Sequence, residues 1–163
     1  MAILTEHMKQ VVAEQALGFV ATVCPDGTPN LSPKGTTAVW DDDHLVFADI
    51  ASPNTMANLA ANPAIEVNVV DPLLRKGYRF KGTATVHIAG SVYDDVVRFY
   101  EARGLDRHRI AGVALITVER AARLVSPAYT MGTTEDEVRA RFTRRLEDLH
   151  GWTIQPSAAA RRE

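Results

Sequence analysis

The sequence has few cysteines and no long apolar run. Cys24 is the single cysteine among 163 residues, so an internal disulfide is excluded and a reducing compartment is favoured. No apolar run approaches the roughly 20 residues that a membrane-spanning helix needs. The start of the chain, MAILTEH, lacks the basic residues and the apolar run of a signal peptide. We therefore expect a cytoplasmic protein that does not contact a membrane.

The chain also lacks an excess of charge of one sign, because 18 Lys and Arg residues oppose 20 Asp and Glu residues. The net charge of −2 gives no electrostatic argument for binding nucleic acid. There is no glycine-rich phosphate loop, no cysteine pair and no pair of histidines at metal-ligand spacing. Ser32 does not lie in a Gly-x-Ser-x-Gly element. We therefore expect no metal site, we assign no catalytic residue, and any chemistry would come from a bound cofactor.

The composition itself, 46% hydrophobic and 23% charged, predicts one globular domain over residues 1–163. Apolar residues spaced three and four apart predict helices, and alternating apolar residues predict strands. The predicted helices are 5–15, 53–62, 91–103 and one that begins at Thr134; the predicted strands are 19–24, 29–40, 44–49, 65–70, 78–88 and 111–119. Short turns between neighbouring strands favour antiparallel pairing. The sequence therefore predicts an α+β fold, mainly β, with a small barrel and flanking helices.

A predicted strand leads directly into the short helix that begins near Ser52. The Ser52 hydroxyl suits an N-cap, Pro53 suits the first helical position, and Pro63 ends the helix. Unpaired N–H groups and the positive end of the helix dipole make such a start attractive to anions. Asn54 and Thr55 add side-chain donors at this point. A capped helix with no ligand would explain the same residues.

A second polar stretch, Asn-Leu-Ser-Pro-Lys-Gly-Thr-Thr at 30–37, interrupts a predicted strand. Pro33 and Gly35 would weaken a central ladder, so we expect the backbone to leave the sheet there and meet another group. An anion held by both polar stretches would use Lys34 as a point charge. Gly82, in the middle of the longest predicted strand, indicates a bulge or a close approach by other atoms.

Together these motifs resemble the pyridoxamine 5′-phosphate oxidase-like family of flavin proteins. They are the Pro-Asp-Gly turn at 25–27, Ser-Pro-Lys-Gly at 32–35, Ser-x-Asn-Thr-x-x-Asn-Leu-x-x-Asn-Pro at 52–63 and Lys-Gly-Thr-Ala at 81–84. The resemblance covers about 6–127. It implies a six-stranded antiparallel split β-barrel and a homodimer, with FMN bound between the subunits. Residues 128–163 would form a C-terminal extension with a terminal helix.

The resemblance also implies three groups of cofactor-binding residues. One group would lie along the isoalloxazine ring, one would flank the ring and the ribityl chain, and one would hold the phosphate. In that order they are Pro33, Lys34 and Gly35; Ala48, Asp49 and Ile50; and Ser52, Asn54 and Thr55.

Asn54 departs from the family pattern, because many members carry Lys or Arg at this position. A neutral amide then replaces a charge-assisted donor, which is roughly twice as strong. Lys34, Lys81 or a residue of the partner subunit could supply the missing charge. A different cofactor, the deazaflavin F420, is the alternative to FMN.

The function that the resemblance implies is a flavin-dependent oxidoreductase acting on an unassigned small molecule. Two alternatives stay open, a non-catalytic flavin or F420 carrier and a homodimer that has lost its ligand. Tyr78, Tyr129 and Trp152 are candidates to cover the ring or to bind substrate, although such residues more often serve packing.

Overall fold

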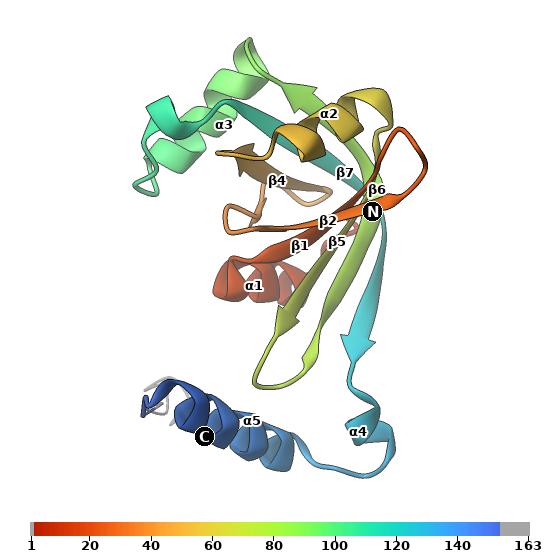
Figure 1. Ribbon diagram of the computed structural model, residues 1–163, viewed down its shortest axis with the longest axis vertical. Coiled ribbons are helices and arrows are strands. Elements are labelled where there is room, and N and C mark those ends of the chain that lie inside the picture. Colours follow the sequence, from red (N-terminus) through yellow and green to blue (C-terminus); the bar gives the residue numbers. More distant parts are fainter. Residues whose placement is uncertain (1, 154–163) are drawn as a thin grey trace. The chain divides into compact units, whose positions relative to one another are not determined.

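The structure is a computed structural model that describes residues 2–153 (Figure 1). The chain divides into two compact units. The barrel unit comprises Met1–Val70 and Gly77–Leu124, and the C-terminal unit comprises Asp71–Lys76 and Val125–Glu163. Among the described residues, no helix is both long enough and apolar enough to span a bilayer.

A single curled sheet forms the body of the barrel unit (Figure 1). Its seven strands follow the order β2-β1-β5-β6-β7-β4-β3. The strands are β1 (Gly18–Val23), β2 (Pro29–Lys34), β3 (Ala38–Val39), β4 (His44–Asp49), β5 (Ala64–Asp71), β6 (Lys76–His87) and β7 (Gly112–Val125). The pairs β1–β2, β1–β5, β3–β4 and β4–β7 are all antiparallel. The predicted α+β class and split antiparallel barrel are confirmed, with seven strands in place of six.

The extra strand arises because the predicted strand 29–40 is two strands. β2 pairs with β1 at one edge of the sheet, whereas β3 pairs with β4 at the other edge. The three residues between them, Gly35, Thr36 and Thr37, carry the chain from edge to edge and close the sheet. We call these three residues the crossover. The expectation that the backbone leaves the ladder at this polar stretch is confirmed, and the single long strand was wrong.

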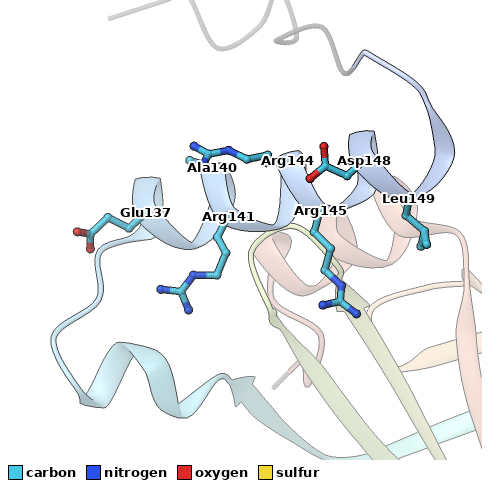
Figure 2. Close-up of a pocket in the computed structure, with 7 residues that line it drawn as sticks. All are labelled: Glu137, Ala140, Arg141, Arg144, Arg145, Asp148 and Leu149. Carbon is cyan, nitrogen blue, oxygen red and sulfur yellow. The ribbon is translucent and has the colours of Figure 1, made fainter.

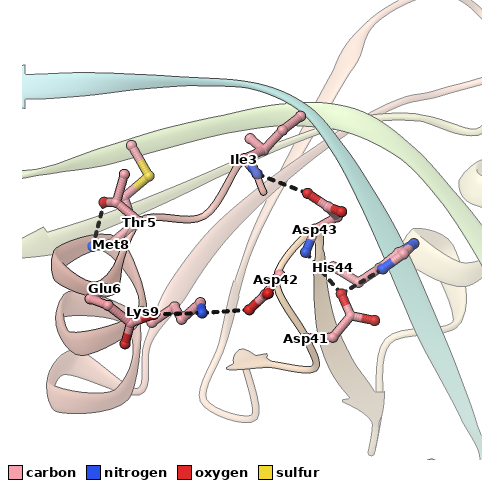
Figure 3. A network of polar contacts seen from close by, with 9 residues as sticks. All are labelled: Ile3, Thr5, Glu6, Met8, Lys9, Asp41, Asp42, Asp43 and His44. Carbon is pink, nitrogen blue, oxygen red and sulfur yellow. Dashed lines mark hydrogen bonds and ion pairs between the residues drawn. The ribbon is translucent and has the colours of Figure 1, made fainter. Parts of the chain in front are cut away.

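The helices of the barrel unit are α1 (Glu6–Gln15), α2 (Pro53–Ala61), α3 (Ser91–Glu101) and the short 3₁₀ helix η1 (Arg107–Arg109). Thr5 caps α1 by accepting a hydrogen bond from the Met8 N–H. The same end of the chain is tied to the turn before β4 (Figure 3). There the Lys9 ammonium lies 2.6 Å from Asp42, and the Ile3 N–H donates to Asp43 at 2.8 Å.

β4 is buried on both faces, which fixes the position of its last residue, Asp49. Leu45 and Phe47 face the barrel interior, where they join a core cluster that includes Phe80 and Ile116. Val46 and Ala48 join a second cluster, formed with α3 and β7. Burying each large apolar side chain contributes about 1.5–3 kcal/mol. β4 is therefore a rigid support for the residues that follow it.

Gly82 confirms the expected close approach in β6. A Cβ atom placed on Gly82 would lie 1.9 Å from the carbonyl oxygen of Thr117. No other residue fits there without moving backbone, so the glycine allows β6 and β7 to pack at this point.

The C-terminal unit consists of the turn 71–76, α4 (Pro127–Thr130) and α5 (Glu135–His150). The Tyr129 hydroxyl donates to the Leu74 carbonyl at 2.6 Å, and the Arg75 guanidinium lies 4.0 Å from the centroid of the Phe142 ring. Thr134 and Glu137 form a capping box at the start of α5, the helix predicted to begin at Thr134.

Candidate functional site

Lys34 is the most unusual polar residue of the barrel unit, because only 4% of it is exposed. Its ammonium group donates to the Ser32 hydroxyl and, at 2.8 Å, to the Ser52 hydroxyl. Burial lowers the pKa of Lys34 below its ordinary value, and the nearby charge of Asp49 offsets part of that effect. A cation held by neutral hydroxyl groups in a buried position is suited to receive an anion.

Asp49 is nearly buried at the end of β4 and orients the connection to α2. Its carboxylate accepts a hydrogen bond from the Ser52 N–H at 2.7 Å, and its carbonyl oxygen accepts one from the Ala111 N–H at 2.9 Å. Asp49 therefore holds the backbone at the helix start, and Lys34, Asp49 and Ser52 are in one hydrogen-bonded group.

The start of α2 has no side-chain cap. Ser52 is at the N-cap position, as predicted, but its hydroxyl makes no capping bond and accepts from Lys34 instead. The predicted hydroxyl cap was therefore wrong, because a distant lysine competes for the same oxygen. The N–H groups of Asn54 and Thr55 belong to the first turn, where a helix offers no internal partner. These groups and the helix dipole are available to an anion.

The crossover is held against β4 by one threonine. The Thr36 hydroxyl donates to the Ala48 carbonyl at 3.1 Å and accepts from the Ala48 N–H at 3.0 Å. The Tyr100 hydroxyl, from α3, donates to the Thr36 carbonyl at 2.6 Å. Sequence reasoning missed Thr36 and Tyr100 as parts of the site. Thr36 lies in the polar stretch that interrupts the predicted strand, which is a weak indication that it belongs to the site. The position of Tyr100 in the sequence indicates only that it packs on one face of a helix.

The structure thus gathers most of the expected cofactor-binding residues around the end of β2, the end of β4 and the start of α2. Ser52 is hydrogen-bonded to both Lys34 and Asp49, and Thr36, the residue after Gly35, is hydrogen-bonded to Ala48. Ile50 is half-buried, Asn54 is exposed and Thr55 is buried, whereas Pro33 is exposed on β2.

Two other candidates are engaged elsewhere. The Lys81 ammonium lies 3.0 Å from the Glu66 carboxylate, in an ion pair that also includes Arg79. Tyr78 is buried in the barrel core, where its hydroxyl lies 2.7 Å from His7 Nδ1, so it is not free to cover a ring. Across residues 2–153, no cluster of three His, Cys, Asp or Glu side chains could hold a metal ion.

A hollow of about 720 Å³ lies along α5, away from Lys34 in the sequence, and is lined by that helix alone (Figure 2). Arg141 and Arg145 extend to one side of α5, and Arg144 and Asp148 lie on another side (Figure 2). Ligand sites generally have polar groups that converge within a concave wall. The charged ends on α5 do not converge, so we place the candidate site at Lys34.

Comparisons with known proteins agree with this fold. The family model described as pyridoxamine 5′-phosphate oxidase matches residues 4–125. HupZ from Group A Streptococcus has 34% identity and a TM-score of 0.68, over 75% of this chain and 94% of that one. No curated protein matches the chain.

Two more distant structures share the fold. An F420 reductase has 22% identity and a TM-score of 0.56, over 72% of this chain and 98% of that one. An FMN-binding protein from Syntrophomonas wolfei subsp. wolfei has 13% identity and a TM-score of 0.61, over 76% of this chain and 87% of that one.

Proposed function

The chain belongs to the pyridoxamine 5′-phosphate oxidase family, and we propose that it binds FMN through the group of residues around Lys34. The observation that carries the proposal is the buried Lys34 ammonium, bonded to Ser52 at the uncapped start of α2. A dianionic phosphate at this point would restore the electrostatic stabilisation that Lys34 loses on leaving water.

The residues present fit both ends of FMN. For the phosphate, Lys34 provides a charge and the Ser52 hydroxyl and the N–H groups of Asn54 and Thr55 provide neutral donors. Lys34 thereby takes the role that a basic residue at position 54 has in many relatives. For the ring, the surface at Gly35 is open, since a Cβ placed there would have no atom within 4 Å. A flat ring system can therefore approach the backbone between Pro33 and Gly35.

We propose that the protein is a flavin-dependent oxidoreductase for a small molecule. FMN, when bound, supplies hydride or electron transfer. The residues of this chain bind and orient the cofactor. The second candidate is a non-catalytic carrier of FMN or F420, which the exposed neutral Asn54 favours because it weakens the hold on phosphate.

We further propose a cytoplasmic homodimer with the cofactor in the groove between subunits. Phe19 and Leu31, on the neighbouring strands β1 and β2, are 42% and 66% exposed. Phe19 pairs with Pro33, the residue before Lys34. A second copy that covers these apolar side chains would border the candidate site.

Identification of the bound small molecule tests the proposal. Mass spectrometry of the ligand released from purified protein is expected to give FMN, and F420 would support the alternative cofactor. Bleaching of the flavin absorption by NADH or NADPH, with reoxidation by an acceptor, would distinguish an enzyme from a carrier. Colourless protein that takes up neither added FMN nor added F420 would refute the proposal.

A further inference from the structure

The barrel unit contains a hollow of about 640 Å³ between α1, α3 and the crossover. This volume lies within the range of roughly 300–1,000 Å³ that is typical of small-molecule sites. Much of its wall is apolar. The apolar side chains include Val12 and Ala13 on α1, Ala16 immediately after α1, Val39 on β3 and Leu105 after α3.

The hydroxyl groups that line the hollow already have hydrogen-bond partners in the protein. Thr37 donates to the Lys34 carbonyl at 2.9 Å, Tyr100 donates to the Thr36 carbonyl, and the Thr36 hydroxyl is bonded to Ala48. The Lys9 ammonium is engaged by two carboxylates, those of Glu6 and Asp42. These groups have little capacity left for a ligand.

Arg103 is different, because it lines the hollow without an acidic partner. Its guanidinium carbon lies 3.4 Å from the centroid of the Phe99 ring, and Nη1 donates to the Phe99 carbonyl at 2.9 Å. No ion pair involves Arg103 within residues 2–153, and no Asp or Glu lines the hollow. A guanidinium has five N–H donors, so several remain for an incoming acceptor.

We propose that this hollow binds a small organic monoanion, a carboxylate attached to a flat apolar body. The carboxylate pairs with Arg103, whose planar fork matches its two oxygens. The apolar body lies against Phe99 and the apolar face of α1. One available cation in a largely apolar wall selects for a ligand with one negative charge. This site does not depend on flavin binding at Lys34, although the crossover borders both.

The test is isothermal titration of the purified full-length protein with 2-naphthoate, which has one carboxylate on a flat apolar body. We expect saturable binding of one equivalent per chain. Arg103→Gln is expected to weaken it by about tenfold or more, because a charge-assisted pair is lost. The neutral analogue 2-naphthamide is expected to bind the unmodified protein more weakly by a similar factor.

Arg98→Gln is the matched control, because Arg98 lies near the end of α3, shortly before Arg103 in the chain, but pairs with Asp95 and does not line the hollow. It is expected to leave naphthoate affinity unchanged, and both variants should keep the melting temperature of the parent protein. Absence of saturable binding, or equal affinity in Arg103→Gln and the parent, would overturn the proposal. Equal affinity for naphthoate and naphthamide would also overturn it.

Discussion

Replacing Lys34 by Met removes the ammonium from the candidate site while keeping a long, largely apolar side chain. If this ammonium receives the FMN phosphate, one charge-assisted contact is lost, worth about 1.5–3 kcal/mol. That loss corresponds to a decrease in affinity of roughly ten- to a hundredfold. The fold should tolerate the change, since a buried charge is replaced by an apolar group and the hydroxyl groups of Ser32 and Ser52 can rotate toward other partners.

The assay is titration of FMN fluorescence at several pH values, with the variants compared side by side. Burial lowers the pKa of Lys34. In the protein without flavin, Lys34 therefore begins to lose its proton at a lower pH than a solvent-exposed lysine does. The anion favours the protonated form, so affinity in the parent protein should fall as the pH rises through this pKa. Lys34→Met should lack that dependence. Lys81→Met is the control, because Lys81 pairs with Glu66, and it should bind FMN like the parent. Unchanged affinity in Lys34→Met would show that the Lys34 ammonium does not contact the phosphate.

Three further predictions concern the helix start, the crossover and the C-terminal unit. Asn54→Lys should tighten FMN binding by up to about tenfold at low salt and less at high salt, and weaker binding in a fluorescence titration would indicate another ligand. Thr36→Val should lower the free energy of unfolding by about 1–3 kcal/mol in urea, because the N–H and carbonyl of Ala48 lose their partner; an unchanged midpoint would contradict this. Hydrogen bonds from Thr134 lower the pKa of Glu137 in the folded protein. The cap therefore stabilises α5 at pH values above the ordinary pKa of a glutamate, and this stabilisation is lost as the pH falls through the lowered pKa of Glu137. Far-ultraviolet circular dichroism should show helix loss in acid, and Glu137→Gln should reduce its pH dependence.

Local signals in the sequence predicted the elements whose ends depend on neighbouring residues. Pro53 starts α2 and Thr134 caps α5, and both effects depend only on residues within one turn of the helix. Gly82 permits a close backbone approach because it has no side chain. The prediction of a single strand over 29–40 was wrong because the division of this segment depends on residues far apart in the sequence. Its division into β2 and β3 depends on which strands lie at the two edges of the sheet, and periodicity carries no information about that.

In the candidate site, too, the sequence indicates individual residues but not the contacts between residues that are distant in the chain. The motif residues Lys34 and Ser52 could be named from the sequence, but their mutual hydrogen bond joins residues 18 positions apart. That bond cancels the expected hydroxyl cap on α2. Likewise, Tyr100 reads as a packing residue of α3, and only the fold brings its hydroxyl to the Thr36 carbonyl.

We propose that Lys34 and the first turn of α2 hold the phosphate of a flavin. Parallel titrations with FMN and with riboflavin, which has the same ring and ribityl chain but no phosphate, test it most directly. Several charge-assisted and helix-start contacts would be missing for riboflavin, so we predict that FMN binds at least about a hundredfold more tightly. Equal affinities for the two compounds would mean that neither Lys34 nor the start of α2 binds the phosphate.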